Sequence, residues 1–130
     1  MPKKKTIEKQ TVLLVEDDTF LSGMYVKKLT LEGFDVQLAS DGESGLRQAK
    51  AVKPDIILLD IILPKLDGFH VLEGVKQDPA TKQIPVIMLT NLGARDDVER
   101  GLRLGALDYL IKAHFMPSEV VDKVKKILSK

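Results

Sequence analysis

The chain has 130 residues, of which 44% are hydrophobic and 30% charged, a length and composition that suit one folded domain with its own core. The net charge of +1 gives no overall attraction to nucleic acid or anionic membranes, and the absence of cysteine excludes disulfides and cysteine-ligated metals and fits the cytosol. No apolar run is long enough to span a membrane or resembles a signal peptide, so we expect a cytoplasmic protein that binds neither membranes nor nucleic acid directly.

The N-terminal quarter of the chain predicts a tail, a strand and a helix. Residues 1–10 contain three consecutive lysines and are expected to form a short, basic, flexible tail before a domain of residues 11–130. Residues 12–15 are an apolar run rich in β-formers and predict a strand. A helix is predicted over residues 19–32 because apolar side chains recur there every three to four residues: Leu21, Met24, Tyr25 and Leu29.

Gly33 ends this helix as a C-terminal glycine, and a second strand and helix follow it. Residues 34–39 form the strand, and the turn at Asp41 and Gly42 leads into the helix. Its inner face is expected to carry Leu46, Ala49 and Val52.

The third strand is an unbroken apolar run, Ile56 to Leu59, without alternation. Such a run is typical of a strand buried on both faces of a parallel sheet. Asp67 is a good N-cap for a third helix over residues 68–77, with Phe69, Leu72 and Val75 facing inward.

The C-terminal part continues the same alternation. A strand is predicted over residues 85–90, a helix over 94–104, a strand over 107–111, and a last helix from Pro117. The inward side chains of that helix are Val120, Val121, Val124, Ile127 and Leu128. Five strands alternating with five helices predict an α/β fold, a doubly wound parallel sheet with helices on both faces.

Polar side chains follow the ends of four strands: Glu16 and Asp17, Asp60, Thr90, and Lys112. Because the carboxyl ends of parallel strands meet at one edge, we expect these groups to converge there. Two carboxylates about 4 Å apart repel by about 4 kcal/mol at an effective dielectric of about 20, which favours a cation among them. Mg²⁺ prefers such oxygen ligands. The alternative is that Asp60 only caps its strand and that the other groups are unrelated.

The chemistry open to these groups is narrow. The chain has no Cys nucleophile, no Ser–His–Asp pattern and no glycine-rich phosphate loop, and His70 and His114 are expected at the surface. A carboxylate nucleophile beside a metal is a known route to an aspartyl phosphate. Asp60 would then accept a phosphoryl group whose oxygens contact Lys112 and the Thr90 hydroxyl.

Four segments together resemble the receiver domain of two-component response regulators, the CheY-like family: VLLVEDD, LLDIILPKLDG, PVIMLT and GALDYLIK. The resemblance implies a flavodoxin-like sheet in the order 2-1-3-4-5 and a phosphoacceptor at Asp60. It implies Mg²⁺ or Mn²⁺ held by Glu16, Asp17, Asp60 and the backbone carbonyl of Ile62. It also assigns phosphate binding to Thr90, the Asn91 backbone and Lys112, and a switch to Thr90 and Tyr109.

The resemblance further implies partners. The phosphoryl donor is a phosphohistidine on a sensor histidine kinase or phosphotransfer protein, and the signal reaches a downstream protein through the face of the fourth helix, fifth strand and fifth helix. A phosphorylation-dependent dimer is a further option. Phe20 and Met24, beside the acidic pair, are candidate anchors for the donor. Such a domain catalyses only its own phosphorylation and dephosphorylation.

Three positions depart from the family pattern. Ala113 stands where proline usually follows the lysine and forms a cis bond, and His114 extends the loop; without proline, cis costs about 2.5–4 kcal/mol, so a trans bond or a rearranged loop is expected. Asn91 replaces a small residue above Thr90. Met116 replaces a polar N-cap before Pro117, which weakens the start of the last helix.

Three other functions fit parts of the pattern. A metal-dependent phosphatase or phosphotransferase with an aspartate nucleophile would need an acid two residues after Asp60, where Ile62 stands. A pure interaction module would have lost the polar positions that this chain keeps. A flavodoxin-like cofactor binder would need a phosphate-binding loop where Glu16, Asp17 and Asp18 repel phosphate.

Overall fold

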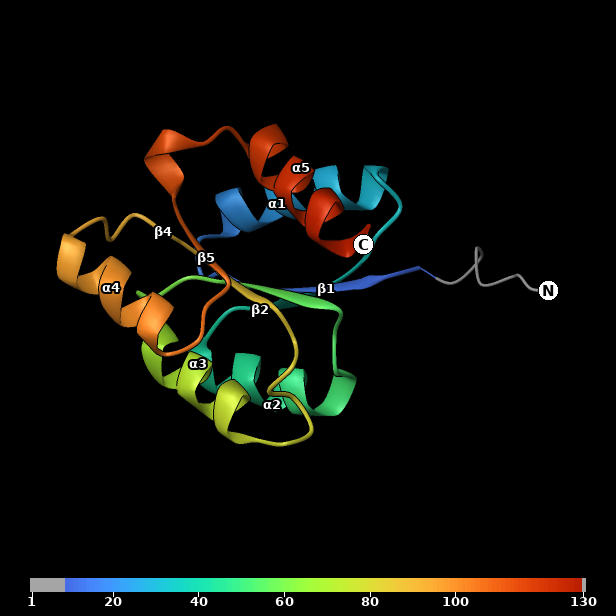
Figure 1. Ribbon diagram of the computed structural model, residues 1–130. Coiled ribbons are helices and arrows are strands. Elements are labelled where there is room, and N and C mark those ends of the chain that lie inside the picture. The colour runs from blue at the N-terminus through green and yellow to red at the C-terminus, as the bar shows by residue number, and fades with distance from the viewer. Residues whose placement is uncertain (1–8, 130) are drawn as a thin grey trace.

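The computed structural model describes residues 9–129, in which strands and helices alternate as the sequence predicts (Figure 1). The strands are β1 (Thr11–Val15), β2 (Asp35–Ala39), β3 (Ile56–Leu59), β4 (Val86–Thr90) and β5 (Asp108–Ile111). The α-helices are α1 (Thr19–Leu31), α2 (Gly42–Val52), α3 (Gly68–Gln77), α4 (Arg95–Arg103) and α5 (Pro117–Leu128), and a short 3-10 helix, η2, covers Lys112–His114. Most of the expected basic tail lies outside the described residues.

The strands form one parallel sheet in the order β2-β1-β3-β4-β5, which confirms the expected topology. The last residue of β1, Val15, pairs with Ala39 of β2 and with Leu59 of β3. The chain leaves β1 toward one edge of the sheet and β3 toward the other. A cleft therefore opens at the carboxyl ends of these two strands, where the residues after Val15 and Leu59 emerge.

Helices cover both faces of the sheet, with α1 and α5 on one face and α2, α3 and α4 on the other (Figure 1). The side chains of β3 alternate between the two cores: Ile57 and Leu59 pack on the α2–α3 side, and Ile56 and Leu58 on the α1–α5 side. This double burial explains why β3 is apolar at every position. Within Arg95–Arg103, Gly101 alone is buried, so α4 buries fewer of its residues than any of the other four α-helices and is loosely packed.

Side-chain caps begin three of the helices. The carboxylates of Asp18, Asp41 and Asp67 accept hydrogen bonds from Leu21 N–H at 3.0 Å, Ser44 N–H at 2.7 Å and His70 N–H at 3.1 Å. Met116 offers no such acceptor, as expected, and the Glu119 carboxylate accepts from the Met116 N–H at 2.8 Å instead. Half of a capping box therefore supports the start of α5.

The predicted inner face of α2 is wrong at one position. Val52 is 41% exposed, whereas Gly45 and Ala49 are buried. A three-residue step falls about 60° short of a full helical turn, so two such steps from Leu46 carry Val52 away from the sheet. Gly45 takes the inward position because the side chain of Val15 leaves no room for a Cβ there.

Within residues 9–129, none of the helices is long and apolar enough to cross a membrane.

We expect Leu58→Ala to lower the free energy of unfolding by about 2–5 kcal/mol, because Leu58 is fully buried in the central strand and its loss leaves a cavity. The matched control is Leu31→Ala on α1, where the side chain is 75% exposed and the expected change is within about 0.5 kcal/mol. Urea denaturation followed by circular dichroism measures both. Equal losses in the two variants would contradict this account of the core.

Candidate functional site

A cleft of about 310 Å³ lies at the carboxyl edge of the sheet. It brings together the strand-end groups that the sequence singles out. Its lining residues are Glu16, Asp17, Asp18, Leu21, Asp60, Ile62, Thr90, Asn91, Leu92 and Lys112. Of the predicted site residues, Tyr109 alone is not part of this lining. Leu21 and Leu92 are additions that the sequence did not suggest as cleft residues.

The two buried carboxylates of the cleft are held by the strands next to them. The Glu16 backbone N–H donates to the Ala39 carbonyl at 3.0 Å, and the Asp60 N–H donates to the Val15 carbonyl at 3.1 Å. Both residues thus continue the sheet ladder past the last strand residue. Asp60 is only 7% exposed, and one of its oxygens, Oδ1, accepts from the Ile61 N–H at 2.6 Å. The protein therefore fixes the orientation of this carboxylate.

Lys112 lies between the two buried carboxylates. Its Nζ donates to Asp60 Oδ2 at 2.7 Å and to Glu16 Oε1 at 2.5 Å. Burial alone would lower the pKa of Lys112, but the hydrogen bonds to Asp60 and Glu16 outweigh burial and raise it. The lysine is therefore charged at neutral pH and offsets part of the repulsion between the carboxylates.

The third carboxylate, Asp17, is exposed at the mouth of the cleft. Glu16, Asp17 and Asp60 each offer an oxygen, and these oxygens lie within 4.8 Å of one another. An oxygen-only set of this size, open on one side, suits Mg²⁺, which binds one or two carboxylates and keeps several waters. The residues present therefore fit a Mg²⁺ ion. Asp18, which the acidic run also contains, instead caps α1.

Thr90 and Tyr109 are linked through the backbone of Leu92. The Thr90 hydroxyl, fully buried, accepts from the Leu92 N–H at 3.4 Å, and the Tyr109 hydroxyl donates to the Leu92 carbonyl. Burial, with the charges of Asp97 and Asp60, raises the pKa of Tyr109 to about 12. The ring also lies against Gly101 of α4, where a Cβ would come within 3.0 Å of it. The tyrosine thus connects the cleft to α4.

The chain after Lys112 differs from the family pattern as the sequence indicates. No peptide bond between residues 9 and 129 is cis, so the Lys112–Ala113 bond is trans, and Lys112–His114 form the turn of η2. Asn91 is exposed at the rim of the cleft. His70 and His114 are exposed and do not line the cleft, as predicted.

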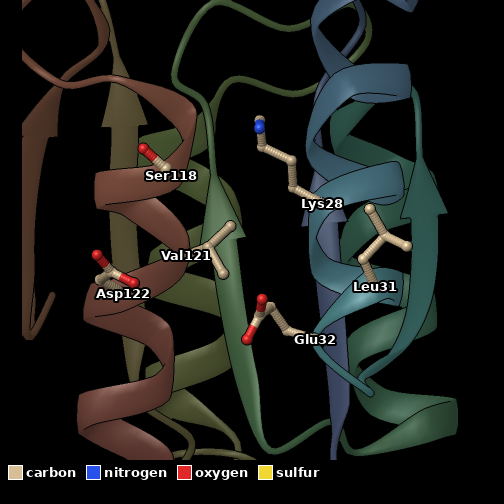
Figure 2. Close-up of a pocket in the computed structure, with 6 residues that line it drawn as sticks. All are labelled: Lys28, Leu31, Glu32, Ser118, Val121 and Asp122. Atoms are coloured by element: carbon tan, nitrogen blue, oxygen red, sulfur yellow. The ribbon is translucent and has the colours of Figure 1, made fainter.

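A second hollow, of about 140 Å³, lies between α1 and α5 (Figure 2). Glu32, just after α1, and Val121 of α5 line it (Figure 2), and Glu32 also pairs with Lys125 of α5 at 2.8 Å. It contains none of the predicted site residues. The cleft at the sheet edge is therefore the candidate site.

We expect Lys112→Met to lower the free energy of unfolding by about 1–3 kcal/mol in divalent-free buffer, because two nearly buried carboxylates lose their cation. The control is Lys123→Met, whose exposed pair with Asp108 at 3.4 Å contributes less than about 1 kcal/mol.

The effect of Lys112 also has a predicted pH dependence. Its pKa is raised by folding, so its contribution is complete below the unfolded value of about 10.4 and is lost as the pH rises through the folded value. Urea denaturation of both proteins from pH 7 upward should show the difference between wild type and Lys112→Met constant at first and vanishing in the alkaline range. Equal stabilities at pH 7 would contradict the role of Lys112.

Comparison with known proteins agrees with this geometry. The family model of the response regulator receiver domain matches residues 12–125. The transcriptional regulator RpaA of Synechocystis is 41% identical over 117 residues, which cover 90% of this chain and 48% of RpaA. The chain therefore spans about half the length of the curated relatives it matches.

Two solved structures resemble the chain over nearly its whole length. A CheY-like response regulator receiver domain protein from Methanospirillum hungatei is 28% identical with a TM-score of 0.85, covering 94% of this chain and 95% of that one. The receiver domain of the sensor histidine kinase PA1611 from Pseudomonas aeruginosa, crystallised with a magnesium ion in its active-site cleft, is 30% identical with a TM-score of 0.85, covering 95% and 100%. With the family model, the fold and the strand-end cluster in agreement, this chain belongs to the response regulator receiver domains of two-component systems.

Proposed function

We propose that the chain accepts a phosphoryl group on Asp60 and acts as a phosphorylation-controlled switch. The observation that carries this proposal is the environment of the Asp60 carboxylate. It is 7% exposed, oriented by the Ile61 N–H, and lies 2.7 Å from the Lys112 ammonium within a set of three carboxylates. A nucleophile, a fixed cation and a metal-binding set thus face one cleft.

The reaction is a transfer between nucleophiles. An Asp60 oxygen forms a bond to phosphorus as the P–N bond of a donor phosphohistidine breaks, and the imidazole leaves with the bonding electrons. Lys112 would move its hydrogen bond from the carboxylate to a phosphoryl oxygen, and the Thr90 hydroxyl and the Asn91 N–H, both from residues that line the cleft, would bind the others. Ile62, two residues beyond Asp60, carries no acid for turnover on other substrates, which favours a switch over a phosphatase.

Glu16, Asp17, Asp60 and the Ile62 carbonyl are the proposed ligands of Mg²⁺ or Mn²⁺. Their support is the 4.8 Å cluster of carboxylate oxygens and the position of Ile62 in the cleft lining. When bound, the ion neutralises charge on the incoming phosphoryl oxygens. The magnesium ion in the cleft of the PA1611 receiver supports the same chemistry here.

We expect Asp60→Asn to abolish acceptance of a phosphoryl group from acetyl phosphate and Mg²⁺, since an amide oxygen is a poor nucleophile. The control is Asp55→Asn, the same change just before β3, at the other end of the strand, where the carboxylate accepts from the Thr11 N–H at 2.7 Å. Intact-mass spectrometry should show one added phosphoryl group on wild type and the control, and none on Asp60→Asn. Undiminished phosphorylation of Asp60→Asn would place the acceptor elsewhere.

The proposed switch runs through Leu92. A phosphoryl group on Asp60 offers strong acceptors, and the Thr90 hydroxyl can donate to one only by turning toward it. That movement breaks its contact with the Leu92 N–H, and the Leu92 carbonyl holds the Tyr109 hydroxyl. Tyr109 then transmits the change to α4 through its contact with Gly101. A downstream protein, or a second copy in a phosphorylation-dependent dimer, reads the α4–β5–α5 face.

We expect Thr90→Ala to be phosphorylated but poorly switched. In wild type, a beryllofluoride mimic should shift the NMR signals of the Tyr109 ring and of the α4 amides; in Thr90→Ala we expect these shifts to fall to less than half. Thr81→Ala is the control. Thr81 follows α3 and is equally buried, but its hydroxyl donates to the Val75 carbonyl and it does not line the cleft. Full shifts in Thr90→Ala would show that the signal bypasses the threonine.

Exposed apolar side chains mark the proposed docking surface for the donor. Phe20 at the start of α1 is 74% exposed, and Ile62 and Met116, on the loops after β3 and β5, are similarly exposed. They follow the strands whose ends form the cleft, so a helical partner covering the cleft would bury them. Met24 is half-buried and is a weaker candidate. The donor that would bind this surface is a histidine kinase or a phosphotransfer protein, in the cytoplasm.

We expect Phe20→Ala to slow phosphotransfer from the donor at least about tenfold, the size of a typical anchor residue, while acetyl phosphate still phosphorylates the variant normally. Leu31→Ala is the matched control, because Leu31 is 75% exposed on the same helix but at its far end. Rapid-quench measurement with the phosphorylated donor separates the two. Equal rates for both variants would place docking on another surface.

A further inference from the structure

The loop between β3 and α3, residues 61–67, rests on the start of α2. The Gly42 N–H donates to the Pro64 carbonyl at 3.1 Å. Next to this bond, the Lys65 ammonium lies 4.0 Å from the Asp41 carboxylate that caps α2. The outer half of the loop therefore takes its position from the first residues of a helix that contributes nothing to the cleft itself.

Gly42 is the tightest point of this contact. A Cβ at Gly42 would lie 1.7 Å from the Leu66 carbonyl oxygen and 2.6 Å from the carbonyl carbon. Both are backbone atoms, which cannot turn aside as the end of a long side chain can. Any residue other than glycine here must push the loop away from α2 or displace the start of the helix.

The loop is also strained at its outer turn. Lys65 has a φ of 72°, in the left-handed region that favours glycine, and the Leu66 N–H donates to the Pro64 carbonyl at 2.8 Å across it. This is a γ-turn, a conformation that persists only where neighbours hold it. At the inner end of the loop, the Gly68 N–H donates to the Ile61 carbonyl at 2.9 Å. Ile62 lies between these two fixed points.

We propose that Gly42, by letting the Pro64–Leu66 turn rest on α2, is a positioning residue that holds Ile62 in place for Mg²⁺ binding. This inference rests on the proposed function, in which the Ile62 carbonyl is a metal ligand. Ile62 is already tied to the acceptor, because its N–H donates to Asp60 Oδ1 at 3.4 Å. A displaced turn therefore moves a ligand and loosens the acceptor, while Glu16 and Asp17 keep their positions on the end of β1.

The test is the Mg²⁺ dissociation constant of the unphosphorylated full chain, measured by calorimetry. Gly42→Ala is expected to raise it about tenfold, as loss of a residue that supports a metal ligand commonly does. Two glycine controls are available. At Gly23 a Cβ meets nothing within 4 Å, and at Gly74 it meets side-chain carbons of Leu46 at 2.8 Å, which loosens the α2–α3 contact without touching the loop.

Gly23→Ala and Gly74→Ala are both expected to bind Mg²⁺ like wild type, although Gly74→Ala loses stability. Unchanged binding by Gly42→Ala would overturn the inference. So would equal weakening by Gly74→Ala, because general loosening of α2 would then suffice. A wild type that binds no Mg²⁺ would instead overturn the metal role in the proposed function.

A second measurement needs no variant, so it also serves if Gly42→Ala does not fold. Coupling between two sites is reciprocal: if the contact at Gly42 strengthens Mg²⁺ binding, Mg²⁺ must stabilise that contact. Saturating Mg²⁺ should therefore slow hydrogen exchange of the Gly42 amide severalfold more than that of the Gly74 amide, which reports only the general stabilisation of the fold by a bound ligand. No slowing at Gly42, or equal slowing at Gly42 and Gly74, would also overturn the inference.

Discussion

The interaction on which the cleft depends is the bridge from the Lys112 ammonium to the Glu16 and Asp60 carboxylates. The two carboxylates are nearly buried beside each other, and the ammonium between them offsets their mutual repulsion. Lys112 reaches both because parallel strands end at a common edge, which brings the ends of β1, β3 and β5 close together although β4 lies between β3 and β5. The bridge is therefore a product of topology as much as of residue type. It also fixes the position of the Asp60 carboxylate at the end of β3.

The burial of β3 on both faces and the convergence of the strand-end polar groups were predictable from the sequence. The unbroken apolar run of β3 indicated burial on both faces, and the structure divides its side chains between two cores. The convergence of Glu16, Asp60, Thr90 and Lys112 followed from strand ends alone. Both depend on the spacing of apolar residues, from which strands can be predicted, and on the fixed geometry of parallel sheets.

Other features had no sequence signal because they involve backbone atoms or subtle rotations. The partner of the Tyr109 hydroxyl is the Leu92 carbonyl, and any residue type carries a carbonyl. The β3–α3 loop can rest on α2 because Gly42 has no side chain, whereas in the sequence Gly42 indicates only a turn. Val52 lies three residues after Ala49 in the apolar pattern, but the second three-residue step turns its side chain away from the sheet. In each case, tertiary packing decided what local pattern left open.

The loose attachment of α4 has a consequence for the energetics of the whole domain. Its contacts with the rest of the protein include the Arg100 guanidinium 4.1 Å above the Phe69 ring and the Gly101 backbone against Tyr109. With so little apolar surface to expose, this helix is expected to be a unit of low local stability that can open while both cores stay intact. In the proposed switch, regulation would be confined to a part of the fold whose rearrangement leaves global unfolding untouched. A modest bonding change at the sheet edge would then be large enough to control it.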